Sequence, residues 1–146
     1  MPMSTDIAAI LAQTHPYDLL TPEERAELAQ QAGKRTVAAG EIVYRIGQPV
    51  TELCLILSGR IEIADEGGDL LSILGPRNSF GERGLMRDGI APVTATATED
   101  SVLLTIAAPV FKALVATHPR VLRFFDRTRP TAARRQDITT MALSEL

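Results

Sequence analysis

The chain has 146 residues, a net charge of −3, one cysteine and no tryptophan, and 45% of its residues are hydrophobic. This length and composition fit one domain with its own core and argue against a disordered chain. The apolar runs are far shorter than the roughly 20 residues of a membrane helix, and residues 1–6 lack the basic and apolar regions of a secretory signal. We therefore expect a cytoplasmic protein without membrane contact.

Charge is distributed unevenly along the chain. Residues 1–119 carry 9 basic and 15 acidic side chains, whereas residues 120–146 carry 6 arginines and 3 acidic residues. The arginines are Arg120, Arg123, Arg127, Arg129, Arg134 and Arg135. Because the acidic body would repel nucleic-acid phosphates, this distribution favours a solvated helix face or a linker over direct DNA binding.

Residues 1–33 form the first predicted segment, which is helical. Apolar residues from Ile7 to Leu11 have helical i, i+3, i+4 spacing, and His15-Pro16 interrupts the run. Thr21-Pro22-Glu23-Glu24 has the pattern of a capping box with proline at the first helical position. A second helix is therefore expected to begin at this motif and to end at Gly33.

Residues 34–108 form the second predicted segment, in which short β-type runs alternate with glycines. The predicted strands are Thr36-Val37, Glu41 to Ile46, Leu53 to Leu57, Arg60 to Ala64, Leu70 to Leu74, Val93 to Ala97 and Val102 to Ile106. The glycines lie where turns need a positive φ or a tight reversal. About seven strands at this spacing predict a mainly β fold, an antiparallel barrel or jelly roll flanked by helices.

The only cysteine, Cys54, lies within an apolar run of the second segment. It has no second cysteine with which to pair, so an internal disulfide and a multi-cysteine metal site are both excluded. We expect a buried, reduced thiol.

Residues 109–128 form the third predicted segment, in which helical spacing returns on both sides of His118-Pro119. Four large apolar residues crowd into the second half of this segment, and they predict a homodimer contact. They are Val121, Leu122, Phe124 and Phe125. Residues 129–146 are predicted to be a tail or a linker.

The segment from Phe80 to Gly89 lies between two predicted strands and is the best candidate for a binding site. A short helical turn that starts at Gly81 would direct backbone N–H groups and a positive dipole end toward a phosphate. Glu82 beside it would accept hydrogen bonds from a sugar hydroxyl. The alternative is an ordinary β-crossover turn in which Gly81 and Gly84 serve only backbone geometry.

Motifs spread over residues 34–128 resemble one known family. They are Gly40-Glu41, Gly47, Ser58-Gly59-Arg60-Ile61, Phe80-Gly81-Glu82 and Thr94-Ala95-Thr96-Ala97. Together they resemble the cyclic-nucleotide-binding domain of the catabolite activator protein and of the regulatory subunit of protein kinase A. The resemblance implies a regulatory domain of signal transduction with cyclic AMP or cyclic GMP as a possible ligand.

Further details look closest to one bacterial subgroup. They are His15-Pro16-Tyr17-Asp18, Phe80-Gly81-Glu82-Arg83, His118-Pro119 and Phe124-Phe125-Asp126-Arg127. In those signal-transduction proteins the domain precedes paired CBS domains and a nucleotidyltransferase domain. We therefore expect an excised N-terminal domain, or a short relative, that works with downstream signalling domains or a partner protein.

The resemblance places the ligand in a cassette of residues 80–94. In the family, a glycine and neighbouring amides contact phosphate oxygens, a glutamate binds the ribose 2′-hydroxyl and an arginine pairs with the phosphate. The residues at the implied positions are Phe80, Gly81, Glu82, Arg83, Gly84, Leu85, Ala91, Pro92, Val93 and Thr94.

Two positions depart from the family pattern. Ala91 occupies the position of the arginine, and Pro92, which has no N–H, follows it. Arg83 and Arg87 are four residues apart and would share one face of a helical turn, so either could supply the missing cation. The alternative is that both lie on the surface.

No catalytic residue is predicted, and no metal site. His15 and His118 precede prolines in the helical segments, outside the predicted barrel, where a helix-end role is expected. The serines lack a Gly-x-Ser-x-Gly context. Two non-enzymatic hypotheses remain: a ligand-sensing regulatory domain, or a degenerate domain that lost its ligand and acts in dimerisation or protein interaction.

Overall fold

The structure is a computed structural model that describes residues 2–126. It is a jelly roll of two four-stranded antiparallel sheets, ordered β1-β8-β3-β6 and β2-β7-β4-β5. The strands are β1 (Gly33–Val37), β2 (Ile42–Tyr44), β3 (Glu52–Ser58), β4 (Ile61–Ala64), β5 (Leu70–Leu74), β6 (Ser79–Phe80), β7 (Thr94–Ala97) and β8 (Ser101–Ala107). The predicted fold class is therefore confirmed.

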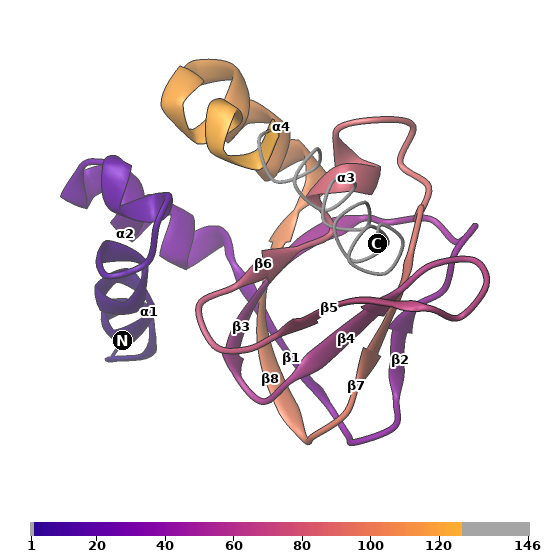
Figure 1. The fold of residues 1–146 in the computed structure, drawn as a ribbon. Helices are drawn as coiled ribbons and strands as arrows, with labels where there is room; N and C mark the ends of the chain where they lie inside the picture. The colour runs from indigo at the N-terminus through magenta and orange to yellow at the C-terminus, as the bar shows by residue number, and fades with distance from the viewer. Residues whose placement is uncertain (1, 127–146) are drawn as a thin grey trace, which may run out of the picture.

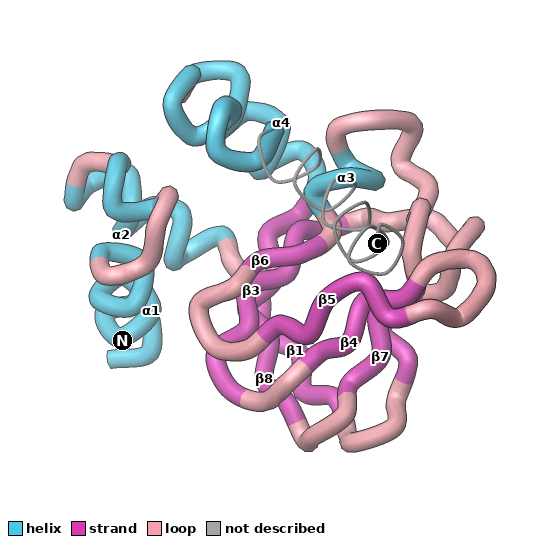
Figure 2. Tube along the Cα trace, in the orientation of Figure 1, coloured by secondary structure: helices cyan, strands magenta, loops and turns pink. Residues whose placement is uncertain are grey.

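The helices gather at the side and at one end of the barrel (Figure 1). They are α1 (Pro2–Ala12), the 3-10 helix η1 (Tyr17–Leu19), α2 (Pro22–Gln31), α3 (Glu82–Leu85) and α4 (Ala108–Thr117). Residues 119–126 are also helical. Figure 2 shows α1 and α2 together beside the strands, with α4 over the end of the barrel at which α3 lies.

Each predicted strand has a counterpart, but β6 was not predicted. This strand is only two residues long, and it pairs with the middle of β3 through Cys54 opposite Phe80 and Leu55 opposite Ser79. A two-residue strand has too little alternation to be seen in a sequence. Its position matters because it leads directly into the cassette.

The core lies between the two sheets. Side chains alternate along β4, where Ile61 and Ile63 are buried, and a longer buried run occupies the middle of β3. Cys54 belongs to this run, and burial raises the pKa of its thiol to about 12. The expectation of a buried thiol is confirmed.

The second N-terminal helix begins as predicted but ends earlier. The Thr21 side chain accepts a hydrogen bond from the Glu24 amide, and Glu24 accepts one from the Thr21 amide, which makes a capping box. The helix ends at Gln31, not at Gly33 as predicted. Gly33 is instead the first residue of β1, opposite Thr105 of β8, because the extended Ala32 already turns the chain into the sheet.

The apolar residues predicted to form a dimer contact are mostly buried within the protomer. Val121 and Phe125 are each 1% exposed, whereas Leu122 is 37% exposed. The Phe125 ring meets Phe111 of α4 edge to face, with centroids 5.3 Å apart. The intramolecular core thus uses Val121 and Phe125, while Phe124 is half-buried and Leu122 is the most exposed of the four. The predicted tail at 129–146, and residues 127–128 before it, lie outside the described residues.

A side-chain hydrogen bond joins the N-terminal and C-terminal helices. The His118 Nε2 lies 3.0 Å from the Glu24 Oε2, at the break between α4 and the next helix. The amide of Thr21 and, next, the contact with His118 hold the pKa of the Glu24 carboxyl below its usual range.

The lowered pKa of Glu24 predicts a specific acid sensitivity. The stability it adds is present above the carboxyl pKa of the unfolded chain and is lost as the pH falls through the folded value. We expect Glu24→Gln to shrink the loss of stability between about pH 7 and about pH 3, as measured by urea unfolding. The exposed Glu23→Gln removes the same charge and is the control; an equal effect of both variants would contradict a specific role of Glu24.

No helix among residues 2–126 is long and apolar enough to cross a membrane.

Candidate functional site

A cavity of about 750 Å³ opens between the barrel, the cassette and the helices. Its walls come from five parts of the chain: the segment after α1, the strands β2, β4 and β5, the turn and strand β6 that follow β5, the cassette, and the helix after α4. The lining residues are Gln13, Thr14, His15, Tyr44, Ile63, Leu71, Ser72, Leu74, Arg77, Asn78, Ser79, Phe80, Gly81, Glu82, Arg83, Pro92, Val93, Phe124 and Phe125. A cavity of this size, largely apolar with a few polar groups, suits a small organic ligand.

The cassette enters the cavity through a glycine turn. Gly81 has a φ of +102°, and a Cβ there would lie 3.1 Å from the Glu52 carbonyl oxygen. The close backbone and the positive φ therefore both require glycine. The turn delivers Glu82 and Arg83 to the cavity on α3, which is one turn long.

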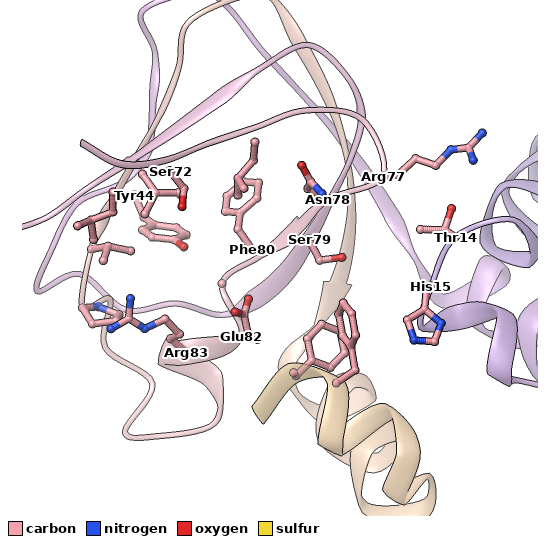
Figure 3. Close-up of a pocket in the computed structure, with 18 of the residues that line it drawn as sticks. Thr14, His15, Tyr44, Ser72, Arg77, Asn78, Ser79, Phe80, Glu82 and Arg83 are labelled. Carbon is pink, nitrogen blue, oxygen red and sulfur yellow. The ribbon is translucent and has the colours of Figure 1, made fainter. Parts of the chain in front are cut away.

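Glu82 is part of the cavity wall and lies between Arg83 on one side and His15 on the other (Figure 3). It is 8% exposed. Its negative charge contributes to the raised pKa values of two buried tyrosines, Tyr17 and Tyr44. Burial, and to a smaller degree the Glu82 carboxylate, raise the pKa of Tyr17, while the hydrogen bond between the Tyr17 hydroxyl and the Ser79 Oγ, 2.8 Å long, opposes the rise.

Tyr44 closes the cavity at the Arg83 end (Figure 3). Burial is the main cause that raises its pKa, the charges of Cys54 and Glu82 raise it further, and the Arg83 guanidinium lowers it. The hydroxyl therefore stays protonated at neutral pH and is available as a donor. The Tyr44 ring packs against Phe80 at 6.1 Å between centroids.

A comparison with protein families decides what kind of domain holds this cavity. The model of the cyclic nucleotide-binding domain matches residues 34–118, which is more than half of the chain. The chain belongs to the cyclic nucleotide-binding domain family.

Known proteins share this domain with the chain. A cyclic nucleotide-gated potassium channel of Mesorhizobium japonicum is 27% identical over 112 residues, which are 77% of this chain and 31% of the channel. The catabolite activator protein of Thermus thermophilus matches in structure with a TM-score of 0.70 and 27% identity, over 92% of this chain and 63% of that chain. The chain thus spans about a third of the channel, and its match with the activator covers less than two thirds of that protein.

A third protein has the same fold and holds guanosine. The regulatory subunit of a cAMP-independent protein kinase A from Trypanosoma cruzi, solved with guanosine, matches with a TM-score of 0.81 and 16% identity. The match covers 97% of this chain and 52% of that chain. The likeness shows the fold, and the two structures together confirm the predicted resemblance to activator and kinase regulatory domains.

The structure divides the expected site residues of this cyclic nucleotide-binding domain into two groups. Phe80, Gly81, Glu82, Arg83, Pro92 and Val93 line the cavity. Gly84, Leu85, Ala91 and Thr94 lie behind its wall. Among the latter, Ala91 is 2% exposed and its amide donates to the Gln48 carbonyl oxygen, while the Thr94 Oγ1 accepts from the Ile46 amide at 3.1 Å. These four residues are therefore not among those that line the cavity.

The prediction that Arg83 and Arg87 share one face of a helical turn is wrong. The helix α3 ends at Leu85, so the i, i+4 spacing does not carry through to Arg87. Arg83 lines the cavity, whereas Arg87 is exposed and lines a separate groove beside α4. Of these two arginines, Arg83 is therefore the one in a position to meet a ligand in the cavity.

Several lining residues of the cyclic nucleotide-binding domain were not predicted from the sequence. Tyr44 comes from β2, Ser72 from the inner face of β5, and His15 and Phe124 from the helical ends. Within the described residues, no group of histidine, cysteine and carboxylate side chains could hold a metal ion.

Proposed function

We propose that this cyclic nucleotide-binding domain is a non-enzymatic ligand sensor that reports occupancy of its cavity through its C-terminal helices. One observation carries the proposal: Phe124 and Phe125 of the last described helix line the same cavity as Glu82 of the cassette. A ligand in the cavity would touch the barrel and the helices at once. A change in the packing of these helices could then pass to whatever follows them.

The proposed ligand is a purine nucleotide or a close relative of one. The cavity combines apolar walls with a buried carboxylate, Glu82, which suits the hydroxyl groups of a ribose. The family supports a cyclic nucleotide, and the guanosine of the Trypanosoma cruzi relative supports a purine nucleoside.

A calorimetric titration with cyclic AMP and cyclic GMP tests this proposal, together with hydrogen exchange of α4 and residues 119–126. We expect heat of binding and a change in the exchange protection of these helices when ligand is added. Binding without any change in the helices would contradict a sensor. No binding of either nucleotide, or of their nucleosides, would remove the ligand from the proposal.

The second hypothesis is a degenerate domain that has lost its ligand and acts in protein interaction. The residues Ala91 and Pro92 favour this hypothesis. Pro92 lines the cavity and has no N–H to donate, and the neighbouring Ala91 is buried. Both features remove contacts that the family resemblance implies for a phosphate.

The variant Pro92→Ala separates the two hypotheses. A sensor should bind cyclic AMP more tightly once the amide at 92 is restored, by about 10-fold to 150-fold, because a hydrogen bond to a charged group contributes about 1.5–3 kcal/mol. Pro76→Ala, at an exposed position outside the cavity, should leave the affinity unchanged. If neither Pro92→Ala nor the natural chain shows heat of binding with cyclic AMP, the interaction module is the better hypothesis.

We also propose that the sensor acts on domains or partners beyond the residues described. The subgroup motifs around His15, Arg83 and His118 support a bacterial signal-transduction protein in which CBS and nucleotidyltransferase domains follow. His15 lines the cavity, and His118 contacts Glu24 where the N-terminal and C-terminal helices meet. The same cavity would then control those domains through residues 119–126.

A further inference from the structure

The charges that face the cavity are unbalanced. Among the described lining residues, two arginines, Arg77 and Arg83, face one carboxylate, Glu82. Arg77 lies at the His15 end, where its Nη1 donates to the Gln13 carbonyl oxygen at 3.3 Å. The Arg83 guanidinium lies at the other end (Figure 3).

The surroundings of Arg83 offer its guanidinium little compensation. Its Nε is completely buried and has no hydrogen-bond partner. No carboxylate of the described residues comes within 4 Å of it, the adjacent Glu82 included. At the same end of the cavity Tyr44 presents a protonated hydroxyl, and Pro92 and Val93 contribute apolar wall. A partly buried cation in such a place has lost water without gaining an anion.

We propose that Arg83 sets the charge of the ligand, and that the site takes a nucleoside phosphate anion through this residue. The inference rests on the proposed sensor function. Glu82 and Arg83 both line the cavity, so a ribose held by the carboxylate would leave its phosphate ester in the space that the guanidinium also lines. The cation thus comes from the start of the cassette and not from position 91, where the resemblance implies an arginine and the chain has a buried alanine.

The proposal is tested by calorimetry on pairs of ligands that differ only in the phosphate: cyclic AMP with adenosine, and cyclic GMP with guanosine. We expect the natural chain to bind each nucleotide more tightly than its nucleoside. Arg83→Gln should weaken nucleotide binding by roughly 30-fold to several thousand-fold, as expected for loss of one partner of a desolvated charge pair. Nucleoside binding should stay unchanged.

Two further variants control the test. Arg87→Gln removes the same charge from the exposed side of the cassette and should leave every affinity unchanged. Arg83→Lys keeps the charge without the planar fork and should restore part of the lost affinity. Thermal unfolding of each variant shows that the fold is kept, and 5′-AMP in place of cyclic AMP shows whether a linear or a cyclic ester is the better ligand.

The outcomes separate the inference from the proposed function. If nucleosides bind as tightly as nucleotides, or if Arg83→Gln behaves like Arg87→Gln, the role of Arg83 is overturned while the sensor stands. If no nucleotide and no nucleoside binds, the sensor and the role of Arg83 fall together.

Discussion

Replacing Gly59 with alanine is expected to lower the free energy of unfolding by about 2–6 kcal/mol. Gly59 has a φ of +100°, and a Cβ there would lie 2.0 Å from the Ser101 Oγ and 2.6 Å from the Ser101 Cα. Backbone strain accounts for about 1–3 kcal/mol, and overpacking for another 1–3 kcal/mol. The clash includes the Ser101 Cα and Cβ as well as the Oγ, so a rotation of the Ser101 side chain cannot relieve it.

The same clash would disturb a hydrogen-bond chain across the end of the barrel. The Ser101 Oγ accepts from the Arg60 amide at 3.1 Å and donates to the Glu99 carbonyl oxygen at 2.8 Å. Gly59 therefore closes the turn from β3 to β4 against the start of β8, a strand that lies about 40 residues further along the chain. Its effect should reach both sheets, since β3 and β4 belong to different ones.

Gly68→Ala is the matched control for this prediction. Gly68 has a similar φ of +86°, in the turn between β4 and β5, but a Cβ there would meet nothing within 4 Å. We expect a cost of about 1 kcal/mol from backbone strain alone. Urea unfolding of the two variants measures the difference, and equal costs would show that the contact with Ser101 is not a tight one.

The contrast between these two glycines shows what the sequence could and could not reveal about the fold. Both lie between strands that alternation predicts, so the sequence identifies them as turn residues. The partner of Gly59, by contrast, is 42 positions further along the chain and becomes a neighbour only when β8 pairs with β3. Local patterns therefore predicted the elements, and missed the contacts that fix the elements against each other.

The candidate site follows the same rule. The sequence predicted that Gly81 and Glu82 would form the cassette, because a glycine turn and the residue after it are local features. It placed Arg83 and Arg87 on one face because it assumed a helix longer than the one turn that forms. The opposite walls come from distant segments, with Tyr44 on β2 and Phe124 on the helix after α4, and they meet the cassette only in the folded chain.

The second large effect is expected at Phe125, where the cavity and the core share one side chain. Phe125→Ala should lower the free energy of unfolding by about 3–5 kcal/mol, because the ring is 1% exposed and its removal leaves a cavity. The ring contacts Phe111 of α4 at 5.3 Å and Tyr17 of η1 at 6.5 Å between centroids. It therefore ties the last described helix to both helical segments.

Leu122→Ala, on the same helix, is the control for that stability change. Leu122 is 37% exposed, so its replacement should cost less than about 1 kcal/mol. Urea unfolding compares the two variants, and a Phe125→Ala cost no larger than that of Leu122→Ala would show that the aromatic cluster is not a structural unit.

The same pair of variants tests how a ligand would be sensed. Phe125 lines the cavity while Leu122 does not, so ligand-dependent protection of residues 119–126 in hydrogen exchange should disappear in Phe125→Ala and persist in Leu122→Ala. Tyr17 contacts the Phe125 ring and also shares a hydrogen bond with Ser79, just before the cassette. Tyr17 therefore links the Phe125 ring to the residues that precede Glu82. In such a sensor, Phe125 would both line the ligand cavity and hold the helix of residues 119–126 in place. A ligand could therefore act on this helix directly, without a chain of intervening residues.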